Sequence, residues 1–135
     1  MENYNKILIN VKKGDAVIID GDKFDINQAS YSVKDGCLYI VSSDDLTLTI
    51  PYGQYQEVKV MAPNGDCVIN LMTTKVGLLD FTSNGGDLVV HGAFERIKFN
   101  SPGGDYVNDA ELPDELLIDD DEINNQTWKN GERYR

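Results

Sequence analysis

The sequence predicts an all-β protein, a single-domain β-solenoid-like stack of short strands joined at Gly-Asp corners. Short apolar or alternating runs, each bounded by Gly, Asp or Asn, recur through the first 108 residues, a pattern typical of strands rather than helices. Eleven such runs leave no room for a long helix in that part of the chain. They span residues 6–11, 16–20, 31–33, 37–42, 46–50, 57–61, 66–70, 76–81, 87–91, 96–100 and 105–108.

The first runs indicate a one-sided core and tight turns. In residues 46–50, Leu and Ile alternate with Thr, so one face of the strand is apolar and the other is not. Asp35-Gly36 separates two strand-like runs and Asp20-Gly21 ends another, and both dipeptides tolerate positive φ. We therefore expect the chain to reverse tightly at both dipeptides.

An internal repeat is the most informative feature of the sequence. It reads strand, small polar corner, Gly-Asp, strand, and it occurs three times, in residues 58–69, 78–89 and 97–107. Its aspartates, Asp66, Asp87 and Asp105, are spaced by 21 and 18 residues, which suits one turn of a β-solenoid. Glycine allows the chain to turn sharply, and we expect each aspartate to accept hydrogen bonds from turn amides.

The order of these elements carries a family resemblance. Residues 33–40 read Val-Lys-Asp-Gly-Cys-Leu-Tyr-Ile, residues 46–53 read Leu-Thr-Leu-Thr-Ile-Pro-Tyr-Gly, and the three Gly-Asp repeats follow. Over residues 30–108 this order resembles the bacterial "putative adhesin" domain family, a family of unknown function. The resemblance implies a β-solenoid-like fold and leaves the function open, because one fold serves many functions. Members of that family are generally longer and often attached to the envelope, whereas we expect this chain to be a short protein without a leader that is strongly acidic at its end.

The sequence changes character after residue 108. We expect a solenoid-like domain in residues 1–108 and an acidic segment with a capping hairpin in residues 109–135. Nine acidic residues and no Lys or Arg lie from Asp105 to Glu122. The apolar residues among them follow neither a helical nor a strand period cleanly, although Asp114 is a suitable cap for a short helix.

The last residues predict a hairpin. Asn130-Gly131 is a turn dipeptide between strand-capable residues. We expect the hairpin to cover the open end of the stack, with Trp128 packed over the last turn.

Charge limits the classes of partner. Twelve Lys and Arg stand against 23 Asp and Glu, which gives a net charge of −11. This charge argues against direct binding to nucleic acid or to an anionic membrane and favours a basic protein partner. The N-terminus lacks the basic segment and apolar run of a secretory signal, and no stretch approaches the roughly 18 apolar residues of a membrane span. We therefore expect a cytoplasmic protein.

Catalytic and metal-binding patterns are missing from the sequence. His91 is the only histidine, and no nucleophile or zinc motif accompanies it. Cys37 and Cys67 are expected to be two buried thiols, because free Cys is often a core residue. A glycosidase-type carboxylate pair has only the abundance of acids in its favour. We expect no enzyme activity, no cofactor and no metal site, with weak calcium binding at residues 119–122 as an open alternative.

The acidic segment is the candidate binding site. It is either a solvated tail, since like charges repel, or a set of carboxylates that replace the phosphates of a nucleic acid. Its apolar residues favour the second interpretation, because a solvating tail has no need of them. The predicted binding residues are Asp109, Glu111, Asp114, Glu115, Leu116, Leu117, Ile118, Asp119, Asp120, Asp121, Glu122 and Trp128.

These observations lead to two functional hypotheses. The first is a non-enzymatic, acidic protein-binding module that blocks a basic nucleic-acid-binding protein, as a phage-type inhibitor of the anti-CRISPR kind and a DNA mimic would. The alternative is an adhesin-like structural or interaction domain, in which exposed Tyr and Thr of the strands carry recognition and truncation after Asn108 leaves binding intact. The sequence predicts no oligomeric state.

Overall fold

All described secondary structure in the protein is β. A computed structural model describes residues 4–27, 29–108, 127–129 and 132–134 of the 135-residue chain. No helix occurs among these residues. The all-β class predicted from the sequence is therefore confirmed.

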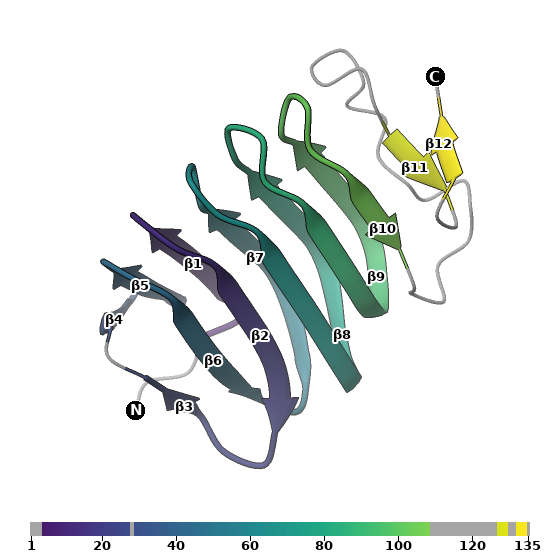
Figure 1. The fold of residues 1–135 in the computed structure, drawn as a ribbon. Helices are drawn as coiled ribbons and strands as arrows, with labels where there is room; N and C mark the ends of the chain where they lie inside the picture. The colour runs from purple at the N-terminus through teal and green to yellow at the C-terminus, as the bar shows by residue number, and fades with distance from the viewer. Residues whose placement is uncertain (1–3, 28, 109–126, 130–131, 135) are drawn as a thin grey trace.

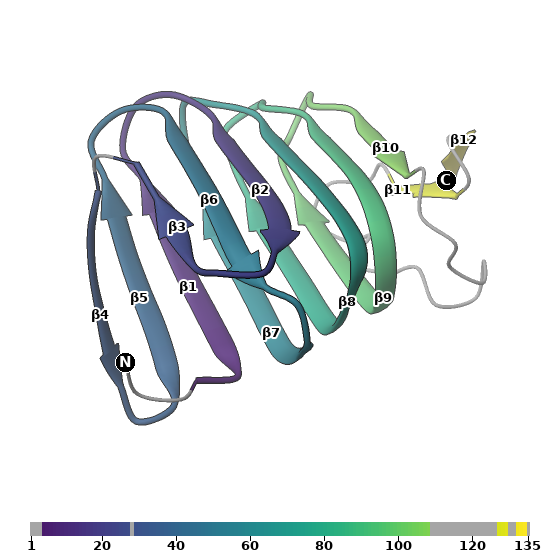
Figure 2. The ribbon, with the colours of Figure 1, turned by 90° about the horizontal axis from the view of Figure 1, so that it is seen from below.

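The strands of the first 108 residues form one mixed sheet that curls around a core (Figures 1 and 2). A short separate hairpin follows them in the sequence. The strands are β1 (Lys6–Val11), β2 (Ala16–Gly21), β3 (Asp25–Ile26), β4 (Ser30–Lys34), β5 (Cys37–Ser42), β6 (Leu46–Pro51), β7 (Gln54–Met61), β8 (Cys67–Thr82), β9 (Leu88–Asn100), β10 (Tyr106–Asn108), β11 (Thr127–Lys129) and β12 (Glu132–Tyr134).

Parallel pairing arranges these strands in two layers. The front layer, nearer the viewer in Figure 1, consists of β6, β2, residues 67–70 of β8, residues 88–91 of β9, and β10. The back layer consists of β5, β1, β7, residues 75–82 of β8 and residues 93–100 of β9. The long strands β8 and β9 run through both layers, and their pairing shifts register between Asn70 and Lys75, where β8 passes from one layer to the other. At one end, β3 and β4 add antiparallel to β6 and β5.

The spatial order of the strands differs from their order in the sequence. β1 pairs with both β5 and β7, and β2 pairs with both β6 and β8. The N-terminal pair is thus inserted between the β5–β6 pair and the rest of the sheet. The chain crosses the end of β2 on its way from β6 to β7, where the Tyr52 amide donates to the Gly21 carbonyl at 2.9 Å.

The core lies between the layers and is built from alternate residues of each strand. Leu46, Leu48 and Ile50 are buried, which confirms the one-sided pattern predicted for that run. At the C-terminal side, the rings of Phe81 and Phe99 stack with centroids 6.0 Å apart. Burial of each side chain of this size contributes about 1.5–3 kcal/mol to the free energy of folding. The rows of buried side chains between the layers therefore hold the curled sheet together.

The turns agree only in part with the sequence. Asp35 and Gly36 have φ of 54° and 76°, which confirms the tight reversal between β4 and β5. The reversal predicted at Asp20-Gly21 is wrong, because β2 stays extended through Gly21 and pairs there with Pro51. The physical reason is that Asp20 points inward and its carboxylate binds backbone amides.

Strand boundaries differ in two further ways. The runs predicted at 66–70 and 76–81 are one bent strand, β8, and those at 87–91 and 96–100 are β9. The two-residue strand β3 was not predicted. The predicted C-terminal hairpin is confirmed as the antiparallel pair β11 and β12.

Candidate functional site

The structure leaves the predicted acidic site unplaced. Residues 109–126, which hold all the predicted acids and Leu116, Leu117 and Ile118, lie outside the described residues. Trp128 belongs to β11, but its side chain is not among the described ones. The predicted contact of Trp128 with the end of the stack therefore stays a prediction.

Five aspartates at one corner of the sheet form a continuous row, the aspartate ladder. Each directly precedes a strand of the front layer, in the spatial order Asp45, Asp15, Asp66, Asp87 and Asp105. The amide of each aspartate after the first donates to the Oδ1 of its predecessor in the row, over 2.8–2.9 Å. The expected hydrogen bonds from corner amides are thus present for Asp66 and Asp87, and they run between neighbouring strands.

The positions before Asp66, Asp87 and Asp105 require glycine, because the backbones of neighbouring corners lie too close together for a side chain. A Cβ on Gly65 would collide with the carbonyl oxygen of Gly14, one on Gly86 with that of Gly65, and one on Gly104 with that of Gly86. Gly65, Gly86 and Gly104 are not among the glycines with positive φ. The sharp turn expected of the repeat glycines is present: Gly85 and Gly103 have positive φ, and the amides of Gly65 and Gly104 donate to the carbonyls of Ala62 and Ser101. At Gly65, Gly86 and Gly104 the lack of a side chain, and not positive φ, is what the corner requires.

Two serines fix the corners further. The Ser83 hydroxyl donates to the Gly65 carbonyl at 3.2 Å and accepts from the Gly86 amide at 3.0 Å. The Ser101 hydroxyl donates to the Gly86 carbonyl at 2.6 Å and accepts from the Gly85 amide at 3.0 Å. These bonds hold the carboxylates of the ladder in place before any partner binds.

Two members of the ladder were missed by sequence reasoning. Asp15 follows Gly14 and precedes the strand residue Ala16, so the Gly-Asp-strand signal was present. Asp45 follows Asp44 instead of Gly. Neither aspartate lies at the regular spacing of the repeat, because the strands that follow them enter the sheet out of sequence order.

The ladder presents charge to solvent. Asp45, Asp15, Asp66 and Asp105 are exposed and Asp87 is half-buried. Neighbouring strands lie about 4.8 Å apart, so the carboxylates recur at about that interval. Among the described residues, no group of three or more His, Cys, Asp or Glu is arranged to hold a metal ion. The ladder can therefore meet a row of cationic groups.

A sixth carboxylate is structural. Asp20 is 8% exposed, and its two oxygens accept hydrogen bonds from the amides of Met72, Thr73 and Thr74 over 2.9–3.1 Å. Desolvation raises the pKa of Asp20, but the amide hydrogen bonds outweigh it and the net pKa is lowered. Asp20 thus fixes the bend of β8 as a buried anion.

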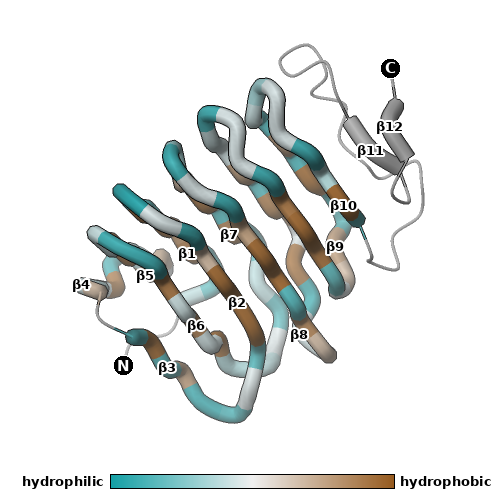
Figure 3. The backbone as a smooth tube through the Cα atoms, in the orientation of Figure 1, coloured by the Kyte–Doolittle hydropathy of each residue, from teal (hydrophilic) through white to brown (hydrophobic). Residues whose placement is uncertain are grey.

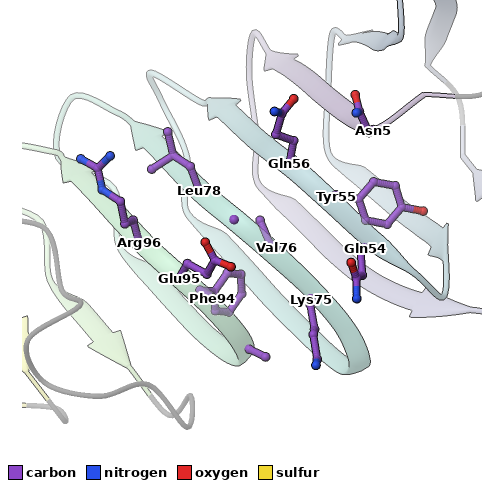
Figure 4. Close-up of a pocket in the computed structure, with 12 residues that line it drawn as sticks. Asn5, Gln54, Tyr55, Gln56, Lys75, Val76, Leu78, Phe94, Glu95 and Arg96 are labelled. Carbon is purple, nitrogen blue, oxygen red and sulfur yellow. The ribbon is translucent and has the colours of Figure 1, made fainter.

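An open groove of about 730 Å³ lies on the outside of β7, β8 and β9 (Figure 4). Its polar side chains include those of Asn5, Gln54, Gln56, Lys75, Glu95 and Arg96. These side chains can hydrogen-bond a polar ligand. The described lining residues include no Ser, Cys or His, so the groove offers none of these nucleophiles or bases.

The remaining reactive side chains occupy ordinary places. Cys37 and Cys67 are free and buried, as predicted. Burial raises the pKa of the Cys67 thiol, with a smaller contribution from the neighbouring charge of Asp66. His91 lies on the outer face of β9 in the front layer.

Comparison with known proteins identifies no relative. No protein-family model matches the chain, and no curated protein matches it. The resemblance to the adhesin family accordingly stays a prediction. Within the described residues, no helix is both long enough and apolar enough to cross a membrane.

Proposed function

We propose that this chain is a non-enzymatic, acidic protein-binding module that occupies the basic surface of a nucleic-acid-binding protein. In this proposal the repeats form a β-solenoid-like stack whose corners display carboxylates in a row. The observation that carries it is the aspartate ladder, a row of five carboxylates of which the first four accept hydrogen bonds from the amides of neighbouring strands.

The spacing of the charges supports mimicry of a nucleic acid. One strand of duplex DNA carries a phosphate about every 3.4 Å along the axis, and the ladder carries a carboxylate about every 4.8 Å. The acidic segment at residues 109–122 adds eight further carboxylates, and the whole chain has a net charge of −11. A cytoplasmic, phage-type inhibitor of the anti-CRISPR kind is the biological role that this chemistry suits.

Preorganisation supports the same proposal. The ladder carboxylates are hydrogen-bonded acceptors in the free protein, so they lose little conformational freedom when a partner binds. A flexible acidic tail alone would have to be ordered at that moment. The ladder therefore supplies carboxylates that are already fixed before a partner binds, which a solvated tail would not.

The test uses the full chain as bait in a bacterial lysate, at about 50 mM and about 200 mM salt, with elution by duplex DNA and mass spectrometry of the eluate. One variant neutralises three of the five ladder residues with Asp66→Asn, Asp87→Asn and Asp105→Asn, which keep an Oδ1 acceptor. A second neutralises the tail with Asp119→Asn, Asp120→Asn, Asp121→Asn and Glu122→Gln. We expect a basic nucleic-acid-binding protein that DNA displaces, weaker recovery with each variant, and a smaller salt dependence. Equal recovery by all three proteins at both salt concentrations, or no displacement by DNA, would contradict the proposal.

A second candidate function, an adhesin-like interaction domain, has the groove on β7–β9 in its favour. Its amide and charged side chains, Gln54, Gln56 and Arg96 among them, suit hydrogen bonding to a polar ligand. Under this alternative, Gln56→Ala with Arg96→Ala abolishes capture of the partner, whereas the ladder and tail variants bind like the parent.

A further inference from the structure

The outer face of the front layer is free of formal charge. Its residues alternate with the buried ones and all point away from the core. They are Val17, Ile19, Thr47, Thr49, Val68, Asn70, Val89, His91 and Val107, and the exposed Met72 follows Asn70 in β8. The outer side of the back layer, by contrast, carries Lys59, Asp80, Arg96 and Lys98. In a chain with 26% charged residues, this uncharged face is a distinct surface.

A column of valines crosses this face. Val17 pairs with Val68, Val68 with Val89, and Val89 with Val107, all in parallel register. Each is more than a third exposed, with Val107 at 45%. Figure 3 shows the hydrophobic stretches of β2, β8, β9 and β10 side by side, next to the hydrophilic corners.

The aspartate ladder forms one border of the same face. Asp15, Asp66, Asp87 and Asp105 each lie two residues before a valine of the column. Because side chains alternate along a strand, the ladder and the column point to the same side of the sheet. The surface therefore combines an apolar stripe with a parallel row of negative charge.

Met72 forms the opposite border. Its side chain is 73% exposed, the most of any large hydrophobic residue in the described part of the chain. Between Met72 and the valines lies a shallow hollow of about 430 Å³, which Asn70 and His91 also line. We call this uncharged face, with its hollow over β8 and β9, the trough; carboxylates lie along one border and a methionine at the other.

We propose that this trough binds a basic amphipathic helix of a partner protein, a proposal that rests on the function proposed above and names the shape of the partner. The apolar face of the helix lies on the valine column, and its cationic flank faces the ladder. Charge complementarity selects this occupant, because a second copy of this chain would bring its own carboxylates to the border.

Dimensions support a helix. Five strands about 4.8 Å apart span about 19 Å, which about 13 helical residues cover at 1.5 Å each. Three outward positions along a strand, such as Val68 to Met72, span about 13 Å, close to the 10–12 Å diameter of a helix. Cations one helical turn apart recur about every 5.4 Å, near the interval of the ladder.

The test measures binding of two fluorescent peptides of about 16 residues to the full chain by anisotropy. Both contain the same Leu, Lys and Gln residues, but only one arranges them as an amphipathic helix with lysines along one flank. We expect the amphipathic peptide to bind at least tenfold more tightly. We also expect Val68→Thr with Val89→Thr to remove that preference, while Val41→Thr with Met61→Thr, both exposed on the back layer, preserves it.

The outcomes separate the two proposals. Equal, salt-sensitive binding of both peptides would overturn the helix site and leave the acidic binding function standing. Failure of both peptides to bind at low salt would count against the acidic function itself. Self-association of the chain that Val68→Thr with Val89→Thr disrupts, seen by sedimentation velocity, would assign the trough to a second copy and overturn the proposal.

Discussion

Replacement of Asp20 is expected to cause a large loss of stability. The Asp20 carboxylate accepts hydrogen bonds from three consecutive amides, those of Met72, Thr73 and Thr74. These amides lie at the bend where β8 passes from the front layer to the back layer. Asp20→Ala removes the acceptor and leaves these amides without it. The same change removes the anchor between β2 and the bend.

The magnitude follows from the number of bonds. A hydrogen bond to a charged group contributes about 1.5–3 kcal/mol, and water replaces part of it at a site that is 8% exposed. We expect Asp20→Ala to lower the free energy of unfolding by about 4 kcal/mol, a large part of the roughly 5–15 kcal/mol of a domain. Asp20→Asn keeps one acceptor oxygen, so its cost should be about half as large.

Urea unfolding followed by far-UV circular dichroism measures the effect. With a slope near 2 kcal/mol per molar urea, a loss of about 4 kcal/mol lowers the midpoint by about 2 M. Asp22→Asn, at an exposed position in the following turn, is the matched control and should change the midpoint little. An Asp20→Ala midpoint within about 0.3 M of the parent would refute the role of the amide cluster.

The pH dependence gives an independent check. Although desolvation raises the pKa of Asp20, the amides lower it overall, so the folded pKa lies below that of the unfolded chain. The stabilisation is therefore complete above the unfolded value near pH 4 and is lost as the pH falls through the folded pKa. The difference in unfolding free energy between the parent and Asp20→Asn should be constant above about pH 5 and shrink below pH 4. A difference that grows on acidification would contradict the sign of the shift.

Two further predictions concern the corner and the core. Gly86→Ala should lower the free energy of unfolding by about 3 kcal/mol, because the added Cβ collides with the Gly65 carbonyl oxygen. Gly103 has a φ of 84° and open space around it, so Gly103→Ala should lower that free energy by only about 1 kcal/mol. Both values are measured by the same urea titration. Equal losses would refute the close-approach argument. Cys67, which is 0% exposed and has a raised pKa, should not react with a disulfide reagent at pH 8 until urea unfolds the chain. Rapid labelling of Cys67 in the native protein, located by mass spectrometry, would contradict its burial.

Much of the fold was accessible from local sequence patterns. The runs at 6–11 and 37–42 are strands with the predicted bounds, because alternation of apolar residues depends only on which side of the strand meets the core. The Asp35-Gly36 turn was accessible for the same reason, since positive φ is a local preference. What local patterns could not reveal is that residues 66–70 and 76–81 form one strand, because the bend depends on the distant Asp20.

The candidate site was predicted less well. The three regularly spaced aspartates were recognised as hydrogen-bond acceptors, and the contacts of Asp66 and Asp87 bear this out. Asp15 and Asp45 could not be placed beside them, because their positions depend on the insertion of β1 and β2 between strands that come later in the sequence. The valine column could not be predicted either, because it depends on the register between four strands, β2, β8, β9 and β10, and no single run of the sequence shows that register.

The construction of the ladder constrains what it can bind. The first four carboxylates each accept a hydrogen bond from the amide that precedes the next strand, so the separation of hydrogen-bonded strands, about 4.8 Å, sets the interval between charges. Substitution elsewhere cannot tune this interval. The number of charges grows only by adding strands to the stack. Selectivity must therefore come from the neighbouring surface, where Val68, Val89 and Met72 decide whether an apolar stripe can follow the cations of a partner. For this reason exchange of Val for Thr, which leaves every charge in place, distinguishes recognition of a shaped partner from general attraction to a basic one.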